Sequence, residues 1–192
     1  MQRKIAITGH TKGIGKCLYK RLTDKGYEVR GYSTSTGYNI LRPNRIINDV
    51  VGWADVFVNN AYAPGAQTRL LYSIYEEWYK KSKLIVNLGA TSSDSVDNFS
   101  ILGYSKDWTP YVSDKARLDF ACTQLSKKYK KGRCRVTNIR PGFVNTDSTS
   151  TFKMFVKRFM MKPDKVAEMI EWVIEQDPKY QIRELSFDMG NI

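Results

Sequence analysis

The sequence predicts an α/β fold, with a doubly wound parallel sheet between two layers of helices (three-layer α/β/α), formed as a single domain by residues 1–192. Two observations lead to this prediction. Apolar runs of strand length alternate along the chain with segments of helical periodicity, which is the pattern of a parallel sheet covered on both faces. The chain also has the length for one core, and 42% hydrophobic with 26% charged residues is typical of a folded globular protein.

The predicted elements follow in a fixed order. The strands are expected at Lys4–Ile7, Tyr27–Tyr32, Asp55–Val58, Leu84–Leu88, Arg135–Ile139 and Glu184–Phe187. The helices are expected at Lys16–Lys25, at Ile46–Gly52, around the apolar stripe of Leu71, Ile74, Tyr75 and Trp78, at Tyr111–Lys130, and from Pro163 through Val166, Ile170 and Val173. Apolar residues three and four positions apart indicate helices, and proline suits a first helical turn. In the helix 111–130 we expect Ala116, Phe120 and Leu125 to face the core.

Composition disfavours several classes of function. The formal net charge is +12, but the cations are spread over many segments and form no nucleic-acid motif, so we interpret them as a basic exterior and expect no nucleic-acid partner. Cys17, Cys122 and Cys134 lie far apart without metal-ligand spacing, so we expect no disulfide framework, no metal site and a reducing cytoplasmic setting. No apolar run has the length of a membrane helix, and we expect no membrane association.

A glycine-rich turn follows the first predicted strand. Its sequence is Thr8-Gly9-His10-Thr11-Lys12-Gly13-Ile14-Gly15. Glycines allow the backbone to turn tightly and to approach a pyrophosphate at the amino terminus of the next helix, where free N–H groups and the helix dipole favour an anion. The turn therefore predicts a dinucleotide site at the first crossover. We interpret His10, the only histidine, as structural or solvent-facing.

This turn resembles the TGxxxGIG fingerprint of the short-chain dehydrogenase/reductase family. Four further segments match family motifs in the same order: Asn59-Asn60-Ala61 for NNAG, Ile85-Val86-Asn87 before the active-site loop, Tyr111 to Lys115 for YxxxK, and Pro141 to Thr146 for PGxVxT. The resemblance covers nearly the whole chain and indicates a shortened, divergent member with a Rossmann-type sheet. It implies cofactor contacts from Gly9, Thr11, Lys12, Gly13, Ile14, Gly15, Ser33, Thr34, Asn39, Ile40, Asn60, Ala61, Tyr111, Lys115, Pro141, Gly142, Val144 and Thr146.

The residues after the second predicted strand favour NADP(H) over NAD(H). NAD-binding proteins place a carboxylate there to bind a ribose hydroxyl, whereas Ser33, Thr34 and Ser35 include none. Lys12 precedes the second glycine, where NADP-preferring members similarly carry a cation. A hydroxyl cluster and an ammonium can hold the extra phosphate of NADP. Asn39 and Ile40 resemble the family's Asp-Val pair beside the adenine.

Tyr111 and Lys115 are the predicted proton-transfer pair. They lie four residues apart, so on a helix their side chains share one face. Lowering the phenol pKa by two units from about 10 takes roughly 2.7 kcal/mol, which a nearby ammonium can supply. In the mechanism that the resemblance implies, Tyr111 gives a proton to a substrate carbonyl oxygen, or removes one in the reverse direction.

Three departures from the family pattern place efficient turnover in question. Ala90 occupies the position of the family serine, with Thr91 and Ser92 directly after it, and of these we choose Ser92 as the third catalytic residue. The family asparagine has no counterpart between Ala63 and Val86, and the last glycine of NNAG is Tyr62. We therefore expect an NADP(H)-dependent oxidoreductase that interconverts a small carbonyl compound and its alcohol, with a cofactor-binding sensor or regulatory protein as the alternative.

Two expectations concern the surroundings of the site. Residues 147–161 are the predicted substrate lid, or otherwise an amphipathic surface helix, and Ser92–Pro110 is the stretch with the weakest signal for regular structure. A homodimer is predicted through the helices that begin near Leu71 and Tyr111, because family members commonly pair in this way.

Overall fold

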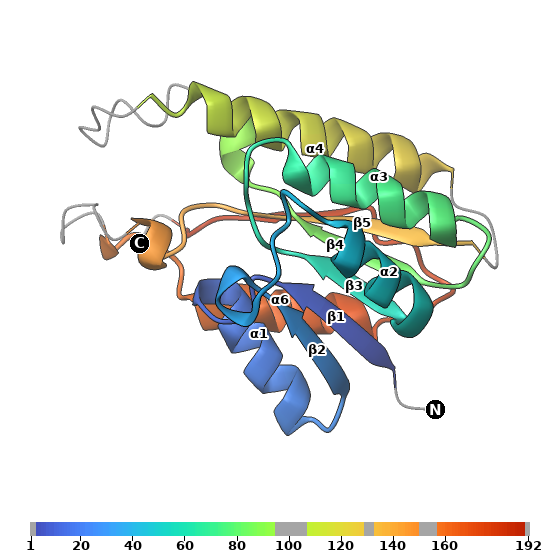
Figure 1. Ribbon diagram of the computed structural model, residues 1–192. Coiled ribbons are helices and arrows are strands. Elements are labelled where there is room, and N and C mark those ends of the chain that lie inside the picture. Colours follow the sequence, from blue (N-terminus) through green and yellow to red (C-terminus); the bar gives the residue numbers. More distant parts are fainter. Residues whose placement is uncertain (1–2, 95–106, 129–132, 150–156, 191–192) are drawn as a thin grey trace.

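The central element is a sheet of six parallel strands, seen in a computed structural model that describes residues 3–94, 107–128, 133–149 and 157–190 (Figure 1). The strands are β1 (Lys4–Thr8), β2 (Glu28–Tyr32), β3 (Val56–Asn59), β4 (Leu84–Leu88), β5 (Arg135–Pro141) and β6 (Glu184–Phe187), in the order β2-β1-β3-β4-β5-β6. All five neighbouring pairs are parallel, which confirms the predicted doubly wound sheet.

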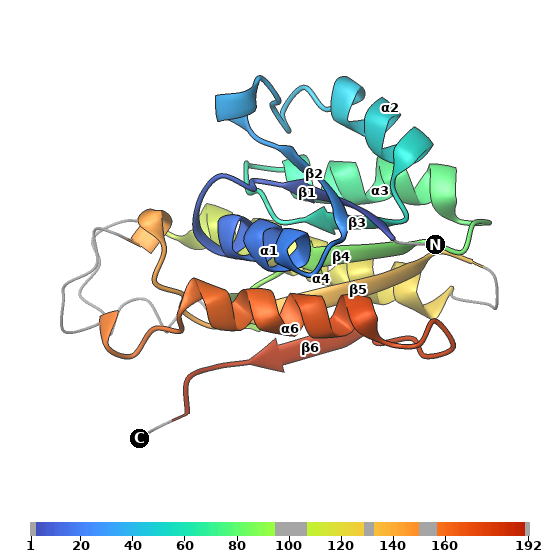
Figure 2. The same ribbon diagram turned by 90° about the horizontal axis from the view of Figure 1, so that it is seen from below.

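Helices cover both faces of the sheet. One face carries α2 (Asn44–Trp53), α3 (Ala66–Trp78) and α4 (Thr109–Lys127), and the other carries α1 (Gly13–Asp24) and α6 (Pro163–Glu175) (Figures 1 and 2). Alternate residues of each central strand enter two separate cores: on β1, Ala6 packs toward α2 and α3, while Ile5 and Ile7 pack toward α1 and α6. Burial on both faces explains why β1, β3 and β4 are rich in apolar residues.

Helix α4 is turned differently from the sequence expectation. Leu125 is buried as predicted, but Ala116 and Phe120 face solvent, and the Phe120 side chain is 67% exposed. The inner face instead presents Lys115, Leu118 and Cys122. The prediction was wrong because Ala116, Phe120 and Leu125 do not lie on one face of a helix, whereas the buried face is an apolar stripe that includes Leu118, Cys122 and Leu125 and also carries Lys115.

The strand order reverses between β1 and β3. In open α/β sheets a ligand crevice lies outside the carboxyl ends of the strands at such a point. The glycine turn follows β1 and Asn60 follows β3, so both flank this crevice. Helix α1 begins at Gly13, three residues before the predicted start at Lys16, because the second half of the glycine turn is itself the first helical turn.

The described ranges do not meet the requirements of a membrane-spanning helix or of a metal-ion site. No helix within them combines the length and the apolarity that a membrane span requires. They also contain no group of three or more His, Cys, Asp or Glu that could hold a metal ion. Cys17, Cys122 and Cys134 are free thiols.

Candidate active site

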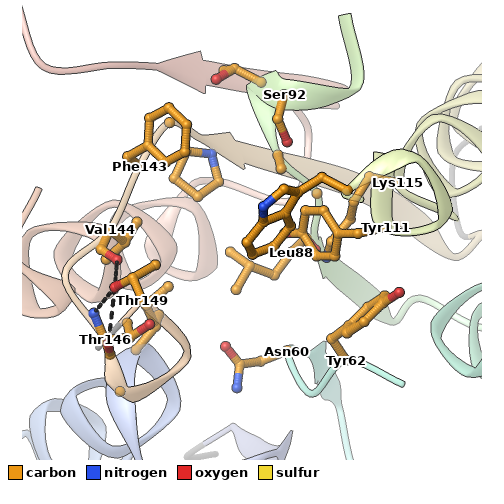
Figure 3. A pocket seen from close by; sticks show the side chains of 18 of the residues that line it. Asn60, Tyr62, Leu88, Ser92, Tyr111, Lys115, Phe143, Val144, Thr146 and Thr149 are labelled. Carbon is orange, nitrogen blue, oxygen red and sulfur yellow. Dashed lines mark hydrogen bonds between the residues drawn. The ribbon is translucent and has the colours of Figure 1, made fainter. Parts of the chain in front are cut away.

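A cavity of about 1040 Å³ opens at the carboxyl ends of β1, β3, β4 and β5 (Figure 3). Most of the predicted site residues line it: Gly9, Lys12, Gly13, Ile14, Asn60, Ala61, Ser92, Tyr111, Lys115, Pro141, Gly142, Val144 and Thr146. Thr11, Gly15, Ser33, Thr34, Asn39 and Ile40 are not among its lining residues. In Figure 3, Val144 and Thr146 form one side of the cavity, and Tyr111 and Lys115 form the opposite side.

The glycine turn is fitted closely to the end of β3. Gly9 has a φ of 73°, and a Cβ on Gly15 would lie 2.2 Å from the carbonyl oxygen of Gly9, so both positions require glycine. The Asn60 amide donates a hydrogen bond to the carbonyl oxygen of Thr8 at 2.8 Å. Asn60 therefore holds the turn in place.

The turn also leaves room for a dinucleotide. At Gly13, which has a φ of 51°, a Cβ would approach the Thr146 side chain at 3.2 Å and narrow the space between the two sides of the cavity. The first turn of α1 has backbone N–H groups without helical partners. The residues present thus fit a pyrophosphate at this helix terminus.

Three hydroxyl groups gather beside the end of β2. Ser33 Oγ lies 3.1 Å from Thr11 Oγ1 and 2.6 Å from Ser35 Oγ, and Ser35 donates to Thr11 at 3.3 Å. Lys12 lies apart from this cluster, with its ammonium 3.7 Å from the Asp147 carboxylate. Both side chains of that pair are more than 70% exposed, so the pair contributes little and the lysine can move.

Asn39 and Ile40 support the loop beyond β2. The Asn39 carboxamide oxygen accepts a hydrogen bond from the N–H of Leu41 at 2.9 Å, which forms a local turn. Ile40 is 8% exposed and packs in the core under α2 and α3.

The loop after β5 is fixed by a residue that the motif comparison did not include. Thr149 Oγ1 accepts a hydrogen bond from the N–H of Thr146 and donates to the carbonyl oxygen of Val144, both at 2.9 Å (Figure 3). Val144 also pairs with Met161 in an isolated bridge. Of the predicted lid, residues 150–156 lie outside the described residues, and Met160 and Met161 are buried.

Tyr111 lies between two aromatic rings. Its ring centroid is 4.9 Å from that of Tyr62 and 5.7 Å from that of Trp108, both in edge-on arrangements. The Tyr62 hydroxyl donates to the Asp114 carboxylate at 3.2 Å. Tyr62 therefore occupies the glycine position of the NNAG motif without filling the cavity, because its ring turns toward α4.

Burial dominates the electrostatics of the Tyr111–Lys115 pair. Burial, with smaller contributions from Tyr62 and Asp119, raises the pKa of Tyr111 to about 12. It lowers the pKa of Lys115 to about 8. The expected lowering of the Tyr111 pKa is therefore wrong for this structure, because burial raises that pKa and keeps the phenol protonated at neutral pH.

Gln67 is the site residue that sequence reasoning missed. Lys115 donates hydrogen bonds to Gln67 Oε1 at 2.8 Å and to the carbonyl oxygen of Leu88 at 2.7 Å. The family resemblance implies an asparagine in this segment, so the glutamine does not count as its counterpart. A glutamine at the start of α3 was the available signal.

The loop after β4 leaves Ser92 at the cavity. Thr91 donates a hydrogen bond to the Asp188 carboxylate at 3.0 Å, and Ser93 donates to the carbonyl oxygen of Ala90 at 2.7 Å and to the Asp119 carboxylate. Both neighbours of Ser92 therefore have structural roles. Thr91 and Ser92 both line the cavity, and Ser92 stays the predicted third catalytic residue.

His10 packs on the sheet. A Cβ on Gly31 would lie 2.1 Å from the His10 ring, and that ring is 5.2 Å from the ring of Tyr19. Burial lowers the pKa of His10. The side chain fixes the outer part of the glycine turn against β2.

Comparisons with known proteins find one fold repeatedly. No protein-family model matches the chain. A 3-ketoacyl-(acyl-carrier-protein) reductase from Brucella melitensis, solved with NADH, has a TM-score of 0.78 at 17% identity and covers 98% of this chain and 97% of its own. A short-chain dehydrogenase from Burkholderia cenocepacia, solved with NADP, has a TM-score of 0.74 at 16% identity and covers 98% of this chain and 97% of its own. An uncharacterized oxidoreductase of Staphylococcus aureus is 21% identical over 95% of this chain and 85% of its own length.

Proposed function

This chain has the short-chain dehydrogenase/reductase fold, and from that premise we propose that it is an NADP(H)-dependent oxidoreductase that interconverts a small carbonyl compound and its alcohol. One observation carries the proposal: Tyr111 and Lys115 face the same cavity as the glycine turn. The oxidoreductase that is similar in sequence, and the solved neighbours that bind NADH or NADP, support it. We also propose the cytoplasm as its setting, in line with the three free thiols.

Each residue of the proposed site has one task. When bound, the nicotinamide supplies or accepts a hydride. The Tyr111 phenol gives a proton to the carbonyl oxygen during reduction, and its raised pKa keeps it protonated for that task at neutral pH. The Ser92 hydroxyl donates a hydrogen bond to the same oxygen. Lys115 holds positive charge beside the phenol and binds the ribose hydroxyls.

Purified protein tests the proposal directly. Titration with NADPH and NADH, followed by cofactor fluorescence, measures binding. A panel of aldehydes and ketones, monitored at the absorbance of the reduced cofactor, then measures turnover. Saturable NADPH binding with no turnover on the panel would favour the alternative of a cofactor-binding sensor, for which the close packing of Tyr62 on Tyr111 is the structural argument.

We expect NADPH to bind more tightly than NADH, and Lys12→Ala to narrow the difference. An ammonium contact to the 2′-phosphate contributes about 1.5 to 3 kcal/mol as a charged hydrogen bond. The exposed pair with Asp147 leaves Lys12 free to make this contact. Fluorescence titration should show weaker NADPH binding and unchanged NADH binding in the variant.

Lys20→Ala is the matched control, since Lys20 lies on α1, the helix that Lys12 directly precedes, in an exposed pair with Asp24. It should leave both affinities unchanged. Equal affinities for the two cofactors in the parent protein would contradict the NADP preference.

We also propose a homodimer through α3 and α4. The two helices lie side by side on one face of the sheet and present Tyr72, 41% exposed, and Phe120, 67% exposed (Figure 1). Light scattering at micromolar concentration should give twice the chain mass of 22.1 kDa. Phe120→Asp should give the monomer mass, and Phe159→Asp, at an exposed position on the loop before α6, should not. A monomeric parent protein would refute the prediction.

A further inference from the structure

The ammonium of Lys115 is buried, and no carboxylate among the described residues pairs with it. Lys115 is 3% exposed, and its two hydrogen bonds go to the neutral oxygens of Gln67 and Leu88. Its Nζ also lies 5.5 Å from the ring centroids of both Tyr62 and Tyr111. Burying a charge is costly unless hydrogen bonds compensate it, so these acceptors are what stabilise the charged form.

Gln67 is itself held rigidly. It is 4% exposed, and its Nε2 donates to the carbonyl oxygen of Asn59 at 2.9 Å and to that of Leu88 at 3.2 Å. The Asn59 amide donates back to the carbonyl oxygen of Gln67 at 2.9 Å. These bonds connect the start of α3 to the ends of β3 and β4. They also orient the amide, because both donors are used on the strands and only Oε1 can face Lys115.

We propose that Gln67 is a positioning residue for the site: it fixes the Lys115 ammonium beside Tyr111 and, being neutral, leaves the lysine's positive charge uncompensated toward the phenol and the cavity. The proposal deepens the proposed function and rests on it for its catalytic meaning. The effect of Gln67 on the charge of Lys115 does not depend on whether the protein turns over a carbonyl compound.

The charged and titratable groups around Lys115 fit this role. From α4 these are the carboxylates of Asp114 and Asp119 and the neutral Cys122 thiol, and the neutral phenols of Tyr62 and Tyr111 complete the set. Asp114 is already paired with Arg117, and Asp119 with Arg140. No described carboxylate lies within ion-pair distance of the ammonium. Among the described residues, a carboxylate at position 67 would therefore be the first anion within ion-pair distance of the Lys115 ammonium.

The substitution Gln67→Glu tests the effect of charge. It keeps the size of the side chain and places an anion at hydrogen-bond distance from Lys115, which raises a lysine pKa by about 1 to 3 units. It also removes the Nε2 donor to the carbonyl oxygens of Asn59 and Leu88, a loss that it shares with Gln67→Leu. Gln67→Leu removes the acceptor and should lower that pKa instead. A residue with a purely structural role would not shift the titration of Lys115 in opposite directions in the two variants.

The experiment is a pH titration of protein labelled with ¹³C at the lysine ε-carbon, followed by NMR without cofactor. The Lys115 resonance is identified by its loss in Lys115→Arg. In the parent protein its midpoint should lie near pH 8, since burial lowers the pKa of Lys115 to about 8. The midpoint should move up in Gln67→Glu and down in Gln67→Leu. Gln124→Glu, which adds the same charge at an exposed position on α4, should not move it.

Two results would overturn the proposal: a Lys115 midpoint that is the same in the parent protein and Gln67→Glu, or a parent Lys115 that titrates with the surface lysines. If Gln67→Leu does not fold, the Lys115 midpoint in the isosteric Gln67→Glu still tests the proposal. NADPH titration of the same samples is read separately. Shifted midpoints together with absent NADPH binding would leave the control of the lysine charge by Gln67 in place and would contradict only the proposed function.

Discussion

Tyr111→Phe should lower turnover by about 10² to 10⁴-fold, the usual contribution of a general acid, while the affinity for NADPH changes little. The substitution removes one hydroxyl, which acts chiefly on the reacting oxygen in the transition state. The two rings that flank Tyr111 contact the ring itself, which phenylalanine keeps. The expected signature is a loss of kcat without a matching loss of cofactor binding.

Lys115→Ala should reduce both quantities. The lysine is expected to bind the ribose in the ground state, and its charge also acts on the Tyr111 phenol. Its loss leaves Gln67 Oε1 and the Leu88 carbonyl oxygen without the hydrogen-bond donor that they have in the parent protein. Single-turnover hydride transfer and NADPH titration on the same preparations separate the two effects.

Tyr72→Phe is the control for the tyrosine substitution, because Tyr72 is exposed on α3, away from the cavity lining. It should behave as the parent protein. If Tyr111→Phe turned over at the parent rate, Tyr111 would not be the acid. Tyr62, which also lines the cavity, or Tyr104, which lies outside the described residues, would then be the next candidates.

Arg140→Met should lower the free energy of unfolding by about 3 to 5 kcal/mol, the cost of removing one partner from a buried ion pair. The Arg140 side chain is 10% exposed, and its guanidinium lies 3.2 Å from Asp119, whose side chain is 15% exposed. It also pairs with Asp94 and Glu184 and donates to Ser93 Oγ at 2.9 Å. The substitution leaves these carboxylates without their cation.

Thermal melting measures this loss. At about 2 to 4 °C per kcal/mol for a chain of this size, the midpoint should fall by roughly 6 to 20 °C. Lys20→Met, in an exposed pair, should change it by no more than about 1 kcal/mol. A melting midpoint for Arg140→Met that matches that of Lys20→Met would show that the cluster does not stabilise the fold.

The pH dependence gives a second measurement. Burial already raises the pKa of Asp119, so its charged form costs stability above the unfolded-state pKa. Without Arg140 that pKa rises further, and the cost at neutral pH grows. The difference in free energy of unfolding between the parent protein and Arg140→Met should therefore become smaller as the pH falls through the raised pKa of Asp119. Arg140→Met combined with Asp119→Asn should recover part of the loss at pH 7.

The local features of this protein follow from short stretches of the sequence. The strands, the glycine turn and the four-residue spacing of Tyr111 and Lys115 could be predicted because each depends on residues that are close along the chain. Apolar runs of strand length mark segments that are buried on both faces of a parallel sheet, and this rule recovers β1, β3 and β4 to within a few residues, whereas the edge strands β2 and β6 are largely exposed.

The buried polar contacts of the site depend on tertiary structure, because they join residues that are far apart along the chain. The Lys115–Gln67 hydrogen bond joins residues 48 positions apart, and the Arg140–Ser93 bond joins residues 47 apart. Such contacts depend on which strands are neighbours and how α3 and α4 are rotated on the sheet. The same rotation turns Phe120 outward, because the buried face of α4 carries Lys115 together with Leu118 and Cys122. A pattern that assigns polar residues to the surface cannot predict a helix whose inner face carries the site, since the hydrogen bonds that make such burial favourable come from other elements.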